Sequence, residues 1–195
     1  MEKVEEIMKR IILASASPRR KELLEQIGLE FEIIPSTCEE VITKQNPGEV
    51  VEELSKQKAE DVAKKVSEGI IIGSDTIVYH AGRILGKPSD RDEATEMLQG
   101  LQGDVHSVFT GVTVIVKENG TKICHTFFQE TKVRVLPMTD KEIEAYVDTK
   151  EPMDKAGAYG IQGRFAAWIE GIEGDYNTVV GLPIAALWQI LKQYL

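Results

Sequence analysis

The chain has 195 residues, of which 42% are hydrophobic and 28% are charged, and its formal net charge is −9. This composition excludes an intrinsically disordered chain and is typical of one globular domain, which we expect to span residues 1–195. Because the acidic excess is spread along the sequence, we expect no nucleic-acid partner and no membrane partner that depends on charge.

Two cysteines, Cys38 and Cys124, are too few for a disulfide framework. The apolar runs are far shorter than a membrane span, and residues 1–10 contain no signal-peptide core. These observations predict a reduced, soluble, cytoplasmic protein.

Over its first 70 residues the chain alternates strand and helix signals. The expected elements are a strand at 11–14, a helix at 18–27, a strand at 31–35 and a helix at 47–68. Ser17 and Asn46 are expected to cap the two helices, each followed by a proline, and Gly28 and Gly69 to end them.

The rest of the chain adds antiparallel strand signals to further helices. The expected elements are two strands within 70–85, a helix at 90–101 capped by Ser89, a hairpin of 108–116 and 122–135 around Asn119-Gly120, a helix from the capping box at Thr139 to Val147, a strand at 165–169, and a helix from Pro183 to the C-terminus. This order predicts an α/β fold with a mixed, twisted sheet and helices on both faces.

The segment Leu13-Ala-Ser-Ala-Ser-Pro-Arg-Arg20 runs from the end of a strand into the start of a helix. The free N–H groups of a helix start, together with Ser15, Arg19 and Arg20, would form a phosphate-binding turn. The alternative is a capped helix whose two arginines lie in solvent. No Walker or dinucleotide-binding pattern is present.

Asp75 follows the buried run Ile70–Ile72, at the end of a predicted strand. A carboxylate there could hold Mg²⁺ or activate a water molecule, and it could equally end the strand in a turn. The pair Glu39-Glu40 lies in the loop after an earlier strand, so a second carboxylate could meet Asp75 at the same sheet edge.

Three further polar residues are candidates for ligand binding. Lys87 lies between Gly86 and Pro88, where the backbone is constrained, and Lys58 lies on the long helix, where a solvated face is the alternative. Gln162 belongs to the glycine-rich segment 151–163, and its amide could read the edge of a base. Asp175 and Asn177 are explained nearly as well by capping as by chemistry.

Taken in order, these stretches resemble the Maf family of nucleotide pyrophosphatases. The matching segments are LASASPRRKELL, Glu39-Glu40, SKQKA, GSDTIV, LGKP, TGV (110–112), EPMDKAGAYGIQG and GDYNTVVGLP. The resemblance implies a fold similar to that of inosine-triphosphate pyrophosphatases, with a central cleft between two lobes. It also implies hydrolysis of a nucleoside triphosphate between the α and β phosphates.

The resemblance also implies roles for individual residues. Asp75 would be the proton acceptor, assisted by Glu40, and these two carboxylates would hold a divalent metal cation, Mg²⁺ or Mn²⁺. Lys58 and Lys87 would contribute to the catalytic phosphate and metal site, together with Ser15 and Arg20. The resemblance is compatible with a homodimer.

Three positions resemble the branch of the family that acts on dTTP and UTP. They are Arg19, Thr76 and Gln162, and a sister branch acting on methylated GTP carries other residues there. Modified pyrimidine triphosphates are further candidate substrates. The alternative function is a nucleotide-binding regulator of septum formation with little catalysis, although the chain keeps both Asp75 and Lys87. A nucleotidyltransferase is less favoured, because no glycine-rich triphosphate loop opens the sequence.

Overall fold

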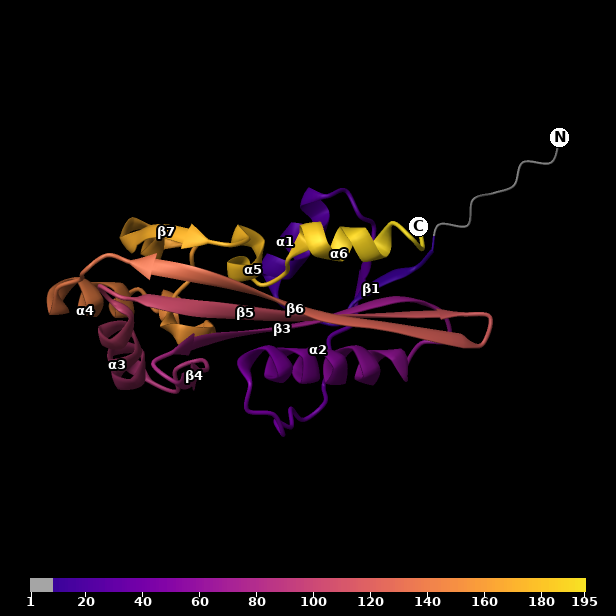
Figure 1. Cartoon of the computed structure of the whole chain (residues 1–195), viewed down its shortest axis with the longest axis horizontal. Helices are drawn as coiled ribbons and strands as arrows, with labels where there is room; N and C mark the ends of the chain where they lie inside the picture. The colour runs from indigo at the N-terminus through magenta and orange to yellow at the C-terminus, as the bar shows by residue number, and fades with distance from the viewer. Residues whose placement is uncertain (1–8) are drawn as a thin grey trace.

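The computed structural model describes residues 9–195 of the chain. The first eight residues of the charged N-terminal segment, where the absence of a signal peptide was expected, lie outside the described residues. A seven-stranded sheet runs through the centre in the order β2-β1-β3-β5-β6-β7, with β4 paired to β3 (Figure 1). None of the helices in residues 9–195 is long and apolar enough to cross a membrane.

The sheet is mixed, as the sequence predicted. Its strands are β1 (Ile11–Leu13), β2 (Glu32–Ile33), β3 (Gly69–His80), β4 (Arg83–Leu85), β5 (Val105–Glu118), β6 (Thr121–Val135) and β7 (Ile169–Glu173). β1 pairs in parallel with both β2 and β3, and every other pairing is antiparallel. The predicted hairpin is β5–β6, which turns at Asn119-Gly120.

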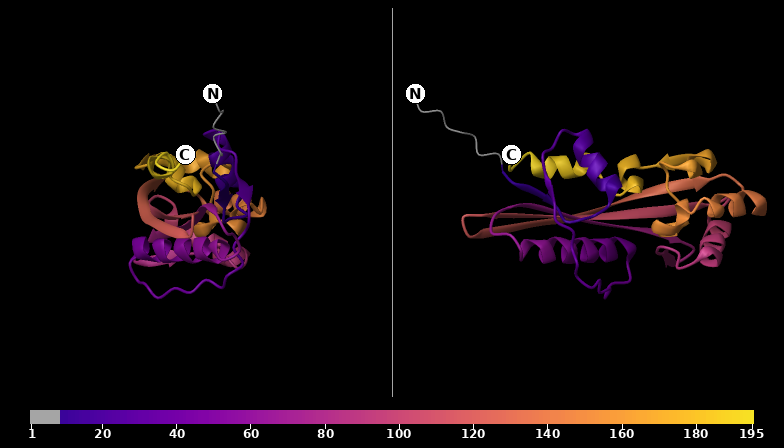
Figure 2. Two further views of the ribbon diagram at one scale, coloured as in Figure 1. Left: turned by 90° about the vertical axis from the view of Figure 1, so that its right-hand side faces the viewer. Right: turned by 180° about the vertical axis from the view of Figure 1, so that it is seen from behind.

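Helices cover both faces of the sheet. They are α1 (Pro18–Gln26), α2 (Pro47–Ala63), α3 (Arg91–Leu101), α4 (Asp140–Asp148), α5 (Tyr176–Val180) and α6 (Ile184–Leu191). α2 lies along one face, and α1, α5 and α6 lie on the other (Figures 1 and 2). α3 and α4 lie at one end of the long strands, beyond the part of the sheet that α2 and α1 cover (Figure 1).

Two predicted helix starts are confirmed. The Asn46 side chain accepts hydrogen bonds from the N–H groups of Gly48 and Glu49 at the start of α2. Thr139 and Glu142 form the reciprocal capping box at the start of α4. Ser17 occupies the N-cap position of α1, but its side chain makes no capping hydrogen bond.

The predicted cap of α3 is wrong by one residue. Asp90, rather than Ser89, is the N-cap, and its carboxylate accepts the N–H of Glu93. Ser89 instead donates its N–H and its hydroxyl to the Glu93 carboxylate, both at 2.6 Å. Either residue type can cap a helix, and the extended backbone at Asp90 decides between them.

The predicted end of α2 is also wrong. The helix ends at Ala63, several residues before Gly69. Gly69 is the first residue of β3, with a φ of +134°, and a Cβ there would lie 2.8 Å from the Arg10 carbonyl oxygen. The glycine therefore serves the close pairing of β3 with the chain before β1, not the end of the helix.

A strand was predicted at 165–169, but residues Arg164–Trp168 form a 3₁₀ turn and the strand follows as β7. Phe165 is fully buried against Tyr146, Tyr159 and Trp168, so its apolar character reflects this aromatic cluster rather than a strand. The strand expected at 31–35 is shortened to the two residues of β2.

The C-terminal region contains one helix more than expected. Asp175 caps the short α5, accepting the N–H groups of Asn177 and Thr178. The final helix ends at Leu191, short of the predicted C-terminus, and its N-cap is Pro183. The capping interpretation of Asp175 is therefore confirmed.

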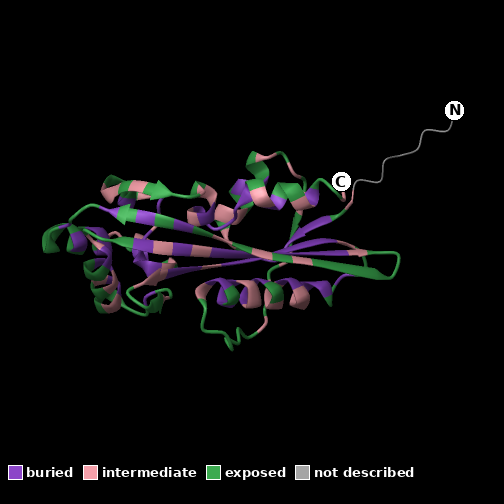
Figure 3. Cartoon of the chain, in the orientation of Figure 1, coloured by how far each residue is buried: buried purple, intermediate pink, exposed green. Residues whose placement is uncertain are grey.

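The core lies on both sides of the sheet. Successive residues of β1 face opposite layers: Ile12 packs with Val62 and Ile71 on the α2 side, and Leu13 packs with Leu24 on the other side. A strand buried on both faces explains the continuous apolar run at 11–14. The tip of the β5–β6 hairpin is exposed (Figure 3).

Two glycines let α2 approach the sheet. A Cβ at Gly73 of β3 would lie 2.4 Å from the Ser55 carbonyl oxygen, and one at Gly111 of β5 would lie 2.2 Å from that of Val51. These are backbone atoms within a helix, so they cannot move aside as a flexible side chain can. α2 is thereby held close to β5 and to β3, the strand that carries Asp75.

We predict that Gly111→Ala destabilises the protein by more than about 2 kcal/mol, because the added methyl group meets the α2 backbone. Urea unfolding measures this. Gly100→Ala is the matched control, since a Cβ at Gly100 on α3 has nothing within 4 Å. This control is expected to be neutral or stabilising by up to about 1 kcal/mol. Equal midpoints for the two variants would contradict the close approach.

A buried histidine supports the glycine-rich segment. His106 of β5 is 2% exposed, its Nε2 lies 2.7 Å from the Tyr159 hydroxyl, and its Nδ1 has no partner among residues 9–195. Burial lowers the pKa of His106 to about 4. The folded protein therefore binds fewer protons at this residue than the unfolded chain does between pH 6.5 and pH 4.

Stability should consequently fall as the pH is lowered from about 6.5 to about 4, by at most roughly 3 kcal/mol from this residue. We predict that His106→Gln removes this part of the slope, whatever its effect on absolute stability. Urea unfolding of both proteins at several pH values in this range tests it. Parallel stability curves for the two proteins would show that His106 does not titrate as predicted.

Candidate active site

The candidate site lies where β3 changes its neighbour. β1 pairs with Ile70–Ile72 of β3, and the last bond joins the Ala14 N–H to the Ile72 carbonyl at 2.8 Å. β4 pairs with β3 only from Val78 onward. The β3 edge between these pairings is therefore open. The chain continues from β1 into α1 on one face and reaches β3 from α2 on the other, which makes this a topological switch point of the kind that binds ligands.

A pocket of about 460 Å³ opens at this edge. Its lining includes eight of the nine predicted site residues: Arg19, Arg20, Glu40, Lys58, Asp75, Thr76, Lys87 and Gln162. The ninth, Ser15, is buried beside the pocket and contacts Arg20. The structure thus brings together residues from the start of α1, the loop before α2, α2 itself, β3, the β4–α3 connection and the glycine-rich segment.

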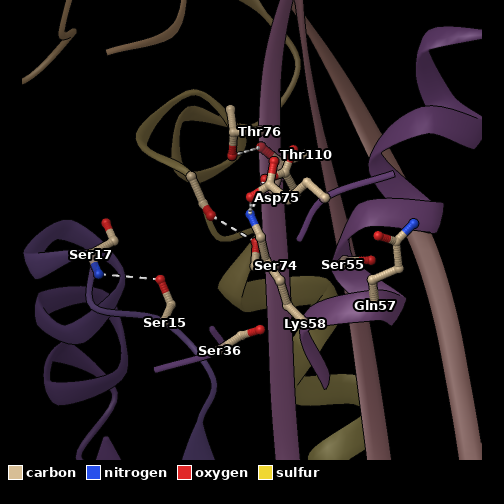
Figure 4. Close-up of polar contacts among 12 residues, drawn as sticks. Ser15, Ser17, Ser36, Ser55, Gln57, Lys58, Ser74, Asp75, Thr76 and Thr110 are labelled. Carbon is tan, nitrogen blue, oxygen red and sulfur yellow. Dashed lines mark hydrogen bonds and ion pairs between the residues drawn. The ribbon is translucent and has the colours of Figure 1, made fainter. Parts of the chain in front are cut away.

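The two predicted carboxylates are joined by a lysine. Lys58 Nζ lies 2.5 Å from Asp75 Oδ1 (Figure 4). The same nitrogen lies 2.9 Å from Glu40 Oε1. Asp75 is 8% exposed, whereas half of the Glu40 side chain is accessible. The ammonium offsets the repulsion between the carboxylates and holds the Glu40 loop against α2. The solvated-face alternative for Lys58 is therefore wrong.

Arg20 is held by three acceptors. Its Nε donates to the Gly181 carbonyl at 2.9 Å, one terminal nitrogen to Ser15 Oγ at 3.1 Å, and the other to Thr76 Oγ1 at 3.2 Å. Burial lowers the pKa of the guanidinium, and the charges of Asp75 and Glu40 act in the opposite direction. Arg20 therefore lies at the turn from β1 into α1 and does not extend into solvent, and its binding of phosphate stays a prediction.

A second basic cluster also lines the pocket. Lys155 Nζ lies 2.5 Å from Asp154 Oδ1 and donates to the Glu151 carbonyl at 2.6 Å, and Arg19 lies 3.5 Å from the other Asp154 oxygen. Partial burial acts to raise the pKa of the Asp154 carboxyl, but Lys155 and Arg19 outweigh this and hold that pKa below its usual value. Asp154 therefore orients two cations that line the pocket.

A backbone contact joins the segments that carry Lys87 and Gln162. The Gly157 N–H donates to the Gly86 carbonyl at 3.0 Å, which ties the glycine-rich segment to the residue before Lys87. Gly157 has a φ of +67°, and a Cβ there would lie 2.8 Å from Val78. The glycine therefore lets this segment approach β3 closely.

Several residues of the site were not predicted from the sequence. Lys155 lines the pocket, Gly181 supplies the carbonyl that holds Arg20 and Ser74, and Thr110 contacts Thr76. Each lies in a segment that carried the family resemblance. The available signals were Lys155 within the glycine-rich segment, and the TGV and VVGLP stretches, whose polar and glycine residues had no assigned role.

The donor set fits a divalent cation that is shared with a phosphate. Among residues 9–195 no group of three or more His, Cys, Asp or Glu side chains could hold a metal alone. Glu40 and Asp75 supply two carboxylates, and Mg²⁺ is often held by one or two carboxylates together with substrate phosphates and water. These two carboxylates therefore fit a divalent cation that binds together with the phosphates of a substrate.

Comparison with known proteins finds relatives that match nearly the whole chain. Several curated relatives are named dTTP/UTP pyrophosphatase. The one from Agathobacter rectalis is 51% identical to this chain, over 95% of this chain and 98% of the relative. One from Lachnoclostridium phytofermentans is 53% identical, and one from Bacillus cereus is 52% identical, each over 96% of both chains.

The fold is shared more widely. The Staphylococcus aureus Ham1 protein superposes with a TM-score of 0.52 at 13% identity, over 96% of this chain and all of that one. This likeness concerns the fold alone, and it agrees with the predicted α/β architecture. A family profile described as Maf-like protein matches residues 10–194. With nearly its whole length matched, and with relatives above half identity, the chain belongs to the Maf family.

Proposed function

We propose that this chain hydrolyses dTTP and UTP between the α and β phosphates, releasing the nucleoside monophosphate and pyrophosphate. The observation that carries the proposal is the buried Asp75 carboxylate, which lies in a pocket that also contains Arg20, Lys58 and Lys87. The relatives named dTTP/UTP pyrophosphatase support the same activity and substrates.

Phosphoanhydride hydrolysis needs an aligned water and neutralised charge more than covalent chemistry. In our proposal Asp75 accepts the proton of the water that attacks the α phosphorus. Glu40 and Asp75 would hold Mg²⁺ or Mn²⁺, which when bound neutralises phosphate charge and lowers the pKa of a bound water. Lys58, Lys87 and Arg20 would stabilise the charge that moves onto the departing pyrophosphate.

We assign the base end of the substrate to the wall that carries Gln162. Gln162 is exposed and lines the pocket, and the apolar side chains of Ile42 and Ile84 line it too. An apolar wall with a single amide can cover a base and read its edge. Arg19 and Thr76, the other two positions of the dTTP/UTP branch, contact Asp154 and Arg20 respectively.

The expected cellular setting is part of the proposal. We infer a cytoplasmic enzyme, because the described cysteines Cys38 and Cys124 are both free. A homodimer stays a prediction. No strand within residues 9–195 pairs with the outer edge of β6 between Thr121 and Thr131, so backbone groups are available there for a second copy.

The first test is pyrophosphate release from dTTP, UTP, CTP, dATP, GTP and 7-methyl-GTP, each with Mg²⁺, with Mn²⁺ and with EDTA. We expect turnover of dTTP and UTP that requires metal. Asp75→Asn should reduce kcat by roughly 100- to 10,000-fold, because the amide cannot accept the proton. Activity confined to 7-methyl-GTP would refute the base assignment. Intact nucleotide binding without any turnover would favour the regulator of septum formation.

A second test concerns the base. We predict that Gln162→Leu lowers kcat/KM for dTTP and UTP by roughly tenfold or more while changing kcat/KM for CTP less, since the lost amide no longer distinguishes the base edges. The same release assay measures both ratios. Gln129→Leu is a control at a glutamine outside the pocket lining. An equal loss for every nucleotide would show that Gln162 acts on the shared phosphates instead.

A further inference from the structure

The guanidinium of Arg20 uses three of its N–H groups inside the protein. An arginine side chain has five such donors, so one on each terminal nitrogen is left after the contacts to Gly181, Ser15 and Thr76. Both of these remaining N–H groups can donate to phosphate oxygens. The direction in which this pair points is set by the three internal acceptors.

Two of those acceptors are hydroxyls, which can donate as well as accept. Ser15 Oγ also accepts the Ser17 N–H at 3.2 Å, so both of its lone pairs are used and its proton is directed away from Arg20. Thr76 has no such backbone donor. Its hydroxyl would lose the contact with Arg20 if its proton turned toward the guanidinium.

Thr110 decides the orientation of the Thr76 hydroxyl. The Thr110 hydroxyl donates to the Thr178 carbonyl at 2.7 Å, and a carbonyl can only accept. Thr110 therefore has no proton left for Thr76 Oγ1, which lies 2.9 Å from Thr110 Oγ1. Thr76 must be the donor in that pair. Its lone pairs are thus directed to Arg20 Nη2 at 3.2 Å.

The fold buries the inner end of this chain of hydroxyls. Thr76 and Thr110 are directly opposite each other on β3 and β5 (Figure 4). Thr110 and Thr178 are both 0% exposed, and neither lines the pocket. Pocket water therefore does not reach the bond from Thr110 to the Thr178 carbonyl, and Thr110 does not touch a molecule bound in the pocket.

We propose that Thr110 is a positioning residue for Arg20. It orients the Thr76 hydroxyl as an acceptor, so that Arg20 presents its two free N–H groups to the phosphates of the nucleoside triphosphate. The effect on turnover rests on the proposed function, whereas the effect on Arg20 itself does not. The proposal also gives a role to the first residue of the TGV stretch, and Gly111 beside it serves the approach of α2.

The test replaces Thr110 with valine, which keeps the shape and removes the hydroxyl. We expect kcat on dTTP to fall roughly 10- to 100-fold while KM changes by less than about threefold, because a misdirected Arg20 affects the transition state more than binding. Thr110→Ser keeps the hydroxyl and should restore kcat to within about threefold of the wild type. Failure of serine to restore kcat would overturn the proposal.

Thr113→Val is the matched control. Thr113 is also on β5 and 0% exposed, and its hydroxyl lies 3.0 Å from both Ser55 Oγ and Thr126 Oγ1. This second chain lies on the α2 side and makes no contact with Arg20. We expect its loss to affect stability but not kcat. A fall in kcat equal to that of Thr110→Val would overturn the positioning role.

A double variant tests the route of the effect. If Thr110 acts through Thr76, then Thr76→Val together with Thr110→Val should have the same kcat as Thr76→Val alone. Losses that multiply in the double variant would show that Thr110 acts by another route, and would overturn the proposal.

An independent readout keeps the proposal separate from the proposed function. The Nε–H NMR signal of Arg20 should be slow to exchange in the wild type, because it is bonded to the Gly181 carbonyl. We expect faster exchange in Thr110→Val and no change in Thr113→Val. An unchanged signal in Thr110→Val would overturn the proposal. If the wild type hydrolyses no triphosphate, the proposed function fails, and this signal still decides the role of Thr110.

Discussion

The open edge of β3 is the constraint on which the site depends. β1 stops pairing at Ile72 and β4 starts at Val78, so five residues of a central strand have one side free. Side chains alternate along a strand. Asp75 therefore points to the α2 side, where Lys58 meets it, and Ser74 and Thr76 point to the other side, toward Gly181 and Arg20. One short segment thus serves both a carboxylate cluster and an arginine cluster.

The charge of the pocket differs in sign from that of the chain. The whole protein has a formal charge of −9, yet the pocket lining contains five Lys or Arg side chains and three Asp or Glu side chains. Net charge alone would suggest repulsion of a triphosphate. The three carboxylates offset part of this charge, but the cations outnumber them by two, so the lining keeps a local excess of positive charge. The acidic surface and a polyanionic substrate are therefore compatible.

The sequence predicted much of the architecture, because the determining signals are local. Caps such as Asn46, the Asn119-Gly120 turn and the alternation of strands and helices need only neighbouring residues. The pattern failed where distant contacts decide: Gly69 lies against the Arg10 carbonyl instead of ending α2, and Phe165 joins an aromatic cluster instead of a strand. For the site, most of the charged residues were found from type and motif, but Lys155 and Asp154 were not. Thr110 and Gly181 were not, since their importance lies in bonds to residues far away in the chain.

The two threonines of β5 show why burial and type alone do not identify such residues. Thr110 and Thr113 are equally buried, and each belongs to a row of hydroxyls that ends on a backbone carbonyl, that of Thr178 or of Glu52. Because a carbonyl only accepts, the protons in both rows run toward it. The rows differ only in their first member, which is Arg20 on one side and the exposed Thr126 on the other. A valine-rich β5 could pack as well, but it would leave the Thr76 hydroxyl free to turn. The geometry of the pocket therefore depends also on residues such as Thr110, which lie behind the side chains that line it.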